Sequence, residues 1–310
     1  MDLINKDIVP DFFIVGAPKA GTTALDAYLR KHPDVFMCRK EAHYFCTDFP
    51  GNVNFESFSD YQQVFDGVQE GQTIGEASVW YLYSEAAVRE ILAVNPEARF
   101  IAMLRDPVKT AQATHGELLL DLREDEPDFE KAWRLQAARR QGEYIPLNAR
   151  EPKHLLYKDV CSWSPQIDRL LDVAPSGSVK IIIMEEFFED PDRGYREVLD
   201  FLGVRNITLD TYPKVNESKR VKSLWLLKAS RDIPRRYPGA MRMAKKIANT
   251  FGLRPGRTID QYVRKGNITH KPRPRLSEEF REELMIEFRP DVERLEGILG
   301  RSLKQYWLKG

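Results

Sequence analysis

The chain has 310 residues, of which 42% are hydrophobic and 30% charged, and its 47 basic residues balance its 47 acidic residues. This composition is ordinary for a globular protein with a sizeable buried core. No apolar stretch approaches the roughly 18 residues that span a bilayer, which excludes a stable membrane span. The three cysteines lack a zinc-like spacing and fit small buried residues in a reducing compartment.

Short apolar runs alternate with helix-like segments along the chain, which predicts βα units and a mostly parallel sheet. His32-Pro33 and Asn95-Pro96 end two of the helices, because proline disfavours helical geometry in the residue before it. Gly203 ends a third helix. We expect strands at Phe12–Val15, Thr73–Ala77, Arg99–Leu104 and Val179–Met184, and helices at Thr22–Lys31, Ala86–Val94 and Tyr195–Leu202.

The last hundred residues combine a basic segment with two expected helices. Residues 214–275 contain eighteen Lys/Arg against three acidic residues, a net charge of +15 that predicts a surface meeting anions or a solvated cap. Ser277 predicts the start of a helix that runs to about Phe288 and ends at Arg289-Pro290. A final helix is expected over Asp291–Leu299. The charged segment Asp121–Tyr144 is expected to be helical and to form part of an acceptor-side wall.

The loop after the first strand carries the clearest chemical signal. Its sequence is Gly16-Ala17-Pro18-Lys19-Ala20-Gly21-Thr22-Thr23. An apolar strand, a glycine-containing turn and a helix start place backbone N–H groups around an anion. The two glycines have the spacing of the nucleoside-triphosphate P-loop, but Lys19 precedes the second glycine and Thr22 stands where that motif has its lysine. This departure disfavours ATP or GTP as the nucleotide.

Five further blocks follow in order, and together with the loop they resemble the sulfotransferases that use 3′-phosphoadenosine 5′-phosphosulfate (PAPS), bacterial members related to the heparan-sulfate type included. The blocks are Lys40–Phe45, Gly75–Ser78, Leu104–Val108, Glu185–Phe187 and Arg289–Glu296. The resemblance implies one α/β domain over residues 1–310. It would be a P-loop-like three-layer sandwich with a central, mostly parallel sheet flanked by helices, and residues 214–275 would form a basic cap.

The resemblance also implies a donor site. Lys19 would bind the leaving phosphate oxygen while the loop surrounds the 5′-phosphate, and Arg105 would hold the 3′-phosphate. Where relatives have a serine for the 3′-phosphate this chain has Ala113, so either Thr114 supplies the hydroxyl or that contact is missing. Trp163 would stack near the adenine or pack in the core. The full set of expected donor-binding residues is Pro18, Lys19, Ala20, Gly21, Thr22, Thr23, Arg105, Ala113, Thr114, Trp163, Lys265, Gly266 and Lys271.

For the acceptor side, the resemblance implies Glu41 as the general base, with a salt bridge to Lys40 or Arg39 as the alternative. His43 and His115 are the substitute candidates. Glu76 either lines the acceptor site or orients Lys19 or a loop, and Trp80 and Tyr81 either form an aromatic wall or belong to the core. Relatives that modify carbohydrates often have a lysine after this glutamate, whereas this chain has Ala77.

These observations predict a cytoplasmic sulfotransferase that moves the sulfuryl group from PAPS to a small molecule, leaving 3′-phosphoadenosine 5′-phosphate (PAP). No metal and no nucleic-acid partner is expected, and a homo-oligomer is left open. The alternatives are a nucleotide kinase or NTPase, a non-catalytic protein that binds anions or membranes, and a sulfotransferase with a saccharide acceptor.

Overall fold

The computed structural model describes residues 8–39, 41–53, 55–213, 220–229, 267–269 and 273–308, and these cluster into two compact units. The first unit contains the described parts of Met1–Thr114, Leu156–Asn216 and Leu276–Gly310. The second contains those of His115–Leu155 and Glu217–Arg275.

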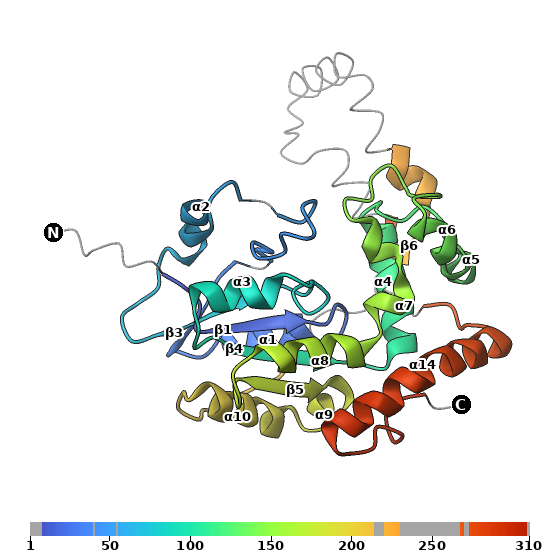
Figure 1. Ribbon diagram of the computed structural model, residues 1–310. Helices are drawn as coiled ribbons and strands as arrows, with labels where there is room; N and C mark the ends of the chain where they lie inside the picture. The colour runs from blue at the N-terminus through green and yellow to red at the C-terminus, as the bar shows by residue number, and fades with distance from the viewer. Residues whose placement is uncertain are drawn as a thin grey trace, which may run out of the picture. The chain divides into compact units, whose positions relative to one another are not determined.

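A five-stranded parallel sheet forms the centre of the first unit (Figure 1). The strands lie in the order β2-β3-β1-β4-β5, and every neighbouring pair is parallel. Their bounds are Phe12–Gly16 (β1), Val35–Met37 (β2), Thr73–Ala77 (β3), Arg99–Leu104 (β4) and Val179–Ile183 (β5). All five residues of β1 are buried, as expected for a central strand covered on both faces. The predicted α/β fold with a parallel central sheet is confirmed.

Helices cover both faces of this sheet. Along the strand order, the chain moves in one direction from β3 through α3 to β4, and from β4 through α8 to β5, but in the other direction from β1 through α1 to β2. Because connections between parallel strands are right-handed, α1 lies on the opposite face of the sheet from α3 and α8. Helix α8 packs against α3 and α14. On the other face, the ring of Tyr28 in α1 lies 6.4 Å from those of Phe187 and Tyr195. The helices are α1 (Thr22–Leu29), α2 (Phe58–Gln62), α3 (Ala87–Val94), α4 (Pro107–Leu120), α7 (Tyr157–Val160), α8 (Trp163–Val173), α9 (Met184–Glu189), α10 (Pro191–Leu202) and α14 (Glu278–Leu299).

Local signals placed most helix ends correctly. Ser277 caps α14 by accepting a hydrogen bond from the backbone N–H of Phe280 at 3.2 Å. Gly203 ends α10 in the left-handed conformation, with φ at 73°, and Gly300 ends α14 in the same way, with φ at 65°.

The expected break at Arg289-Pro290 is wrong, because α14 continues through Pro290. Proline removes one hydrogen bond to the carbonyl four residues earlier, which is that of Ile286. Ile286 is 67% exposed, so water can satisfy that carbonyl. Buried Phe288 and Val292 on either side hold the helix against the core. Tertiary packing therefore outweighs the local signal.

In the second unit, the segment Asp121–Tyr144 is helical only in its middle part, in the two short helices α5 (Phe129–Arg134) and α6 (Gln136–Arg140). Arg139 and Glu124 form a completely buried two-pronged ion pair, with N–O distances of 2.7 and 2.8 Å. Strands β6 (Arg220–Val221) and β7 (Ile268–Thr269) pair antiparallel. Most of the basic segment 214–275 lies outside the described residues.

Within the described ranges, no helix is both long and apolar enough to cross a membrane. The same ranges contain no cluster of His, Cys, Asp and Glu side chains suited to hold a metal ion.

Candidate active site

The predicted site residues of the first unit gather at one edge of the sheet. The carboxyl ends of parallel strands lie at the same edge, where open α/β sheets bind ligands. Ala17, directly after β1, donates its backbone N–H to the carbonyl of Met103 in β4 at 2.6 Å, which links the ends of these neighbouring strands. The predicted residues at these ends, from four different strands, are Lys19, Glu41, Glu76 and Arg105, and Ser78 stands beside Glu76 at the end of β3.

The loop between β1 and α1 has the shape of an anion site. Gly21 is the N-cap residue of α1 and is left-handed, with φ at 91°, and Lys19 is also left-handed, with φ at 59°. A Cβ atom on Gly21 would lie 2.9 Å from Cε2 of Phe188, so glycine alone fits without a shift. A helix N-terminus presents N–H groups and a positive dipole end to an anion. The loop therefore fits a phosphate or sulfate group, and Lys19 adds a positive charge.

Arg105 borders this loop and is partly buried. Its Nη1 donates to the backbone carbonyl of Lys19 at 3.1 Å. Burial lowers the pKa of the Arg105 guanidinium, and the charges of Glu185 and Asp106 partly oppose that effect. Because arginine stays protonated in proteins, the group remains a fixed cation. A planar cation next to an anion-binding loop is suited to a second phosphate group.

The backbone of Arg105 is held by α8, which is in turn bound by a residue of α14. Trp163 donates its indole N–H to the carbonyl of Arg105 at 2.9 Å. Asp291 in α14 accepts the backbone N–H groups of Trp163 at 2.7 Å and Ser164 at 2.9 Å, and thereby caps α8. Trp163 has no exposed surface, so core packing rather than adenine stacking describes this arrangement.

Thr114 carries a buried hydroxyl that has no hydrogen-bond partner among the described residues. Ala113, at the position where relatives have a serine, is also buried and has no polar side-chain atom. A buried hydroxyl without a partner is unfavourable and suggests that a ligand supplies one. Thr114 thus fits a role in donor binding, which stays a prediction.

Glu41 and His43 form a hydrogen-bonded pair in the loop after β2. The distance between His43 Nε2 and Glu41 Oε2 is 2.9 Å. The Glu41 side chain is 34% exposed and that of His43 9%, so an acceptor can reach the carboxylate while the imidazole stays covered. His43 Nδ1 is buried and lacks a hydrogen-bond partner among the described residues, so the ring's side-chain contact with Glu41 is made through Nε2.

Glu76 and the aromatic residues that follow it are buried. Glu76 and Tyr81 have no exposed surface and Trp80 is 5% exposed. The Glu76 carboxyl group accepts hydrogen bonds from the hydroxyls of Tyr61 and Ser78, both at 2.5 Å, and from that of Tyr81. Of the two roles expected for Glu76, this arrangement favours orientation of a loop.

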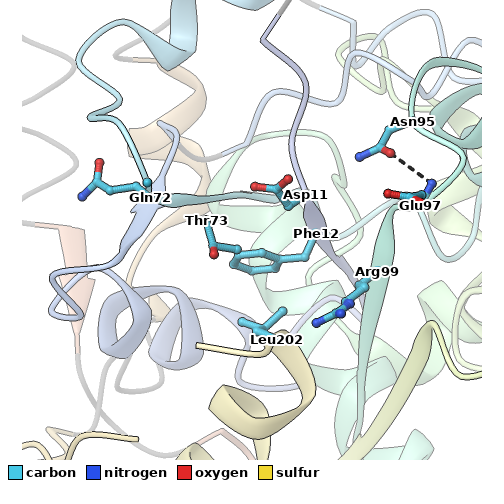
Figure 2. A pocket seen from close by; sticks show the side chains of 9 residues that line it. Asp11, Phe12, Gln72, Thr73, Asn95, Glu97, Arg99 and Leu202 are labelled. Atoms are coloured by element: carbon cyan, nitrogen blue, oxygen red, sulfur yellow. Dashed lines mark hydrogen bonds between the residues drawn. The ribbon is translucent and has the colours of Figure 1, made fainter. Parts of the chain in front are cut away.

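A separate cavity of about 640 Å³ lies at the amino ends of β1, β3 and β4, away from these loops (Figure 2). Its polar side chains hold the backbone around it. Asp11 accepts the N–H of Ile74 at 2.7 Å, and Asn95 accepts that of Glu97 at 3.0 Å. Arg99 donates to the carbonyl of Phe201 at 2.7 Å. These side chains therefore form hydrogen bonds with backbone groups at this edge of the sheet. None of the predicted site residues lines this cavity.

Comparison with known proteins shows the family to which the chain belongs. The profile of the sulfotransferase domain family matches residues 9–284. The chain belongs to the sulfotransferase family. A crystal structure of a sulfotransferase from Alicyclobacillus acidocaldarius is similar, with a TM-score of 0.66, 26% identity, and coverage of 96% of this chain and 99% of that one.

Among curated proteins, this sulfotransferase is 28% identical over 211 residues to heparan sulfate glucosamine 3-O-sulfotransferase 3A1 of Mus musculus. It is 26% identical over 221 residues to heparan sulfate glucosamine 3-O-sulfotransferase 6 of Homo sapiens. Each match covers 68% of this chain but only 50% and 57% of the relatives. The chain therefore spans about half the length of these curated proteins.

The remaining predicted residues of the sulfotransferase belong to the second unit or lie outside the described residues. His115 belongs to the second unit, where its Nε2 is 2.8 Å from the carbonyl of Glu126. Burial lowers the pKa of His115, which suits a neutral structural ring. Lys265, Gly266 and Lys271 lie outside the described residues.

Sequence reasoning assigned no role to Tyr61, Ser78 or Asp291. Ser78 and Asp291 stand inside two of the blocks that carried the resemblance, and a polar residue inside such a block was the available signal. Tyr61 lies outside all of them, and only the packing of α2 brings it to Glu76.

Proposed function

We propose that this sulfotransferase uses PAPS as its donor and transfers the sulfuryl group to a hydroxyl or amine of an acceptor. The observation that carries the proposal is the contact of Arg105 with the carbonyl of Lys19 at 3.1 Å. It joins a loop suited to one anionic group to a cation suited to another. PAPS carries two such groups, the 5′-phosphosulfate and the 3′-phosphate, whereas ATP carries its phosphates in one chain.

In the proposed reaction, PAPS supplies an activated sulfur that an acceptor attacks in line. Glu41 accepts the proton that the acceptor hydroxyl or amine loses as the new bond to sulfur forms. Lys19 and the N–H groups at the start of α1 stabilise the charge on the phosphate oxygen as its bond to sulfur breaks. PAP leaves, and His43 holds the Glu41 carboxylate in place.

For the acceptor, we favour a small molecule. Relatives that modify carbohydrates often have a lysine after the glutamate of the block Gly75–Ser78, whereas this chain has Ala77, which is buried. A saccharide is the alternative, because the curated relatives are named for transfer to heparan sulfate glucosamine. Location in the cytoplasm and a homo-oligomeric state also remain predictions.

Isothermal titration calorimetry with PAP, AMP and ATP tests the donor. We expect PAP to bind more tightly than AMP, and Arg105→Lys to reduce that preference roughly 10-fold or more, because charge-assisted hydrogen bonds contribute about 1.5–3 kcal/mol. Lys19→Ala should lower the transfer rate by about 10²–10³-fold. Arg205→Ala is the control, since Arg205 is 63% exposed and pairs with Asp34. Binding of ATP without any response to PAP would instead support an NTPase.

A screen with ³⁵S-labelled PAPS then identifies the acceptor class. Small hydroxyl and amine compounds form one arm and heparan-type oligosaccharides the other, each with Glu41→Gln as the inactive control. If only the oligosaccharides become labelled, the acceptor is a saccharide and the proposal of a small-molecule acceptor is wrong. Labelling that survives Glu41→Gln would exclude Glu41 as the base.

A further inference from the structure

The buried carboxyl group of Glu76 is linked through hydrogen bonds to the loop that carries Glu41 and His43. Three hydroxyl groups donate to it, those of Tyr61, Ser78 and Tyr81. Tyr61 comes from α2, while Ser78 and Tyr81 come directly after β3. Because Glu76 has no exposed surface, its carboxyl group cannot contact a ligand and acts on the site through its neighbours.

Each of the three hydroxyl residues contacts one of three consecutive loop residues. Ser78 Oγ accepts the backbone N–H of His43 at 3.0 Å. Tyr81 Oη accepts the backbone N–H of Phe45 at 3.4 Å.

Between these two contacts, the ring of Tyr61 stacks on that of Tyr44, with centroids 4.7 Å apart and planes 15° apart. The loop is thus held at three successive positions by residues that all bind one carboxyl group.

The carboxyl group also sets the direction of these hydrogen bonds. A hydroxyl has one proton, so a hydroxyl that donates to Glu76 turns its lone pairs toward other donors. For Ser78 and Tyr81, those donors are the loop N–H groups of His43 and Phe45. His43 has φ at 53°, a conformation that non-glycine residues rarely adopt and that surrounding contacts must hold.

We propose that Glu76 is a positioning residue that, through Ser78 and Tyr81, fixes the loop on which Glu41 and His43 act. The proposal rests on the proposed function, in which Glu41 is the base. Glu76 touches no substrate, and its effect passes through the backbone of residues 43–45. The His43 ring, held at its backbone by Ser78, then places the Glu41 carboxylate through the 2.9 Å hydrogen bond.

Two matched substitutions test this. Tyr61→Phe and Tyr81→Phe each remove one buried hydroxyl bound to Glu76, but only that of Tyr81 also binds the loop backbone. Ser78→Ala removes the other link to the loop. We expect Tyr81→Phe and Ser78→Ala to lower kcat by at least about 10-fold and up to roughly 10²-fold, because small displacements of a catalytic group have effects of this size. Tyr61→Phe should stay within about 2-fold of the wild type.

The affinity for PAP separates positioning from a general loss of structure. All three variants should bind PAP within about 2-fold of the wild type, because the donor loop follows β1 and not β2. Amide hydrogen exchange adds a readout without substrate: the His43 amide should exchange faster in Ser78→Ala, and the Phe45 amide faster in Tyr81→Phe, with Tyr61→Phe unchanged at both.

Equal kcat losses in Tyr61→Phe and Tyr81→Phe would overturn the proposal, as would losses of kcat that follow the loss of folded protein. A wild-type protein that neither binds PAP nor transfers sulfate would instead overturn the proposed function. The two failures are therefore distinct.

Discussion

Replacement of Gly21 by alanine tests whether the loop after β1 shapes the donor site. Gly21 has φ at 91°, and an alanine held left-handed costs roughly 1–2 kcal/mol. Its Cβ would lie 2.9 Å from Cε2 of Phe188 and 3.4 Å from Cε of Met103, so the loop or these side chains must move. Overpacking of this kind adds about 1–3 kcal/mol. Gly21→Ala should therefore lower the free energy of unfolding by about 2–5 kcal/mol.

Gly177→Ala is the matched control. Gly177 is also left-handed, with φ at 79°, but no atom lies within 4 Å of the Cβ that alanine would add, so only about 1–2 kcal/mol should be lost. Urea denaturation measures both losses. Calorimetry with PAP should show binding at least about 10-fold weaker in Gly21→Ala and unchanged in Gly177→Ala, because only the first displaces the start of α1. Equal losses of stability, or full PAP affinity in Gly21→Ala, would refute this reasoning.

Three further predictions concern polar side chains of the first unit. Thr114→Val removes a hydroxyl without a partner among the described residues, so we expect stability in urea to be unchanged or higher. The same change should weaken the binding of PAP and leave the binding of AMP unaffected. Weaker AMP binding would contradict a role at the 3′-phosphate. Asp291→Ala leaves the N–H groups of Trp163 and Ser164 without their acceptor, which should lower the free energy of unfolding by about 1–3 kcal/mol and weaken PAP binding through Arg105. Burial raises the pKa of Glu76, so the folded protein binds more protons than the unfolded chain between the ordinary pKa and the raised one. The contribution of Glu76 to stability therefore falls as pH rises through that interval. Glu76→Gln should remove this part of the pH dependence, which urea titrations at several pH values measure. An identical pH dependence in both proteins would show that the pKa of Glu76 is not raised.

Much of the fold follows from signals close together in the sequence. The run Phe12–Gly16 is apolar throughout, and such a run predicts a strand buried on both faces. Ser277 and Gly300 mark the ends of α14 through local hydrogen bonds and backbone conformation. The Gly21 turn likewise marks the start of α1. The errors came where distant packing decides, as at Pro290, which buried Phe288 and Val292 hold within one helix.

The candidate site likewise combines features that the local sequence predicts with features that depend on distant packing. The sequence of the loop at Lys19 and the order of the later blocks were enough to identify the family, because phosphate recognition uses consecutive backbone groups. The contact of Arg105 with Lys19 depends on β1 and β4 being neighbours, which no local pattern states. The links from Asp291 to Trp163 and from Tyr61 to Glu76 join helices to segments far away in the chain. Such contacts depend on strand order and helix packing, so only the tertiary structure decides which buried polar group supports the site.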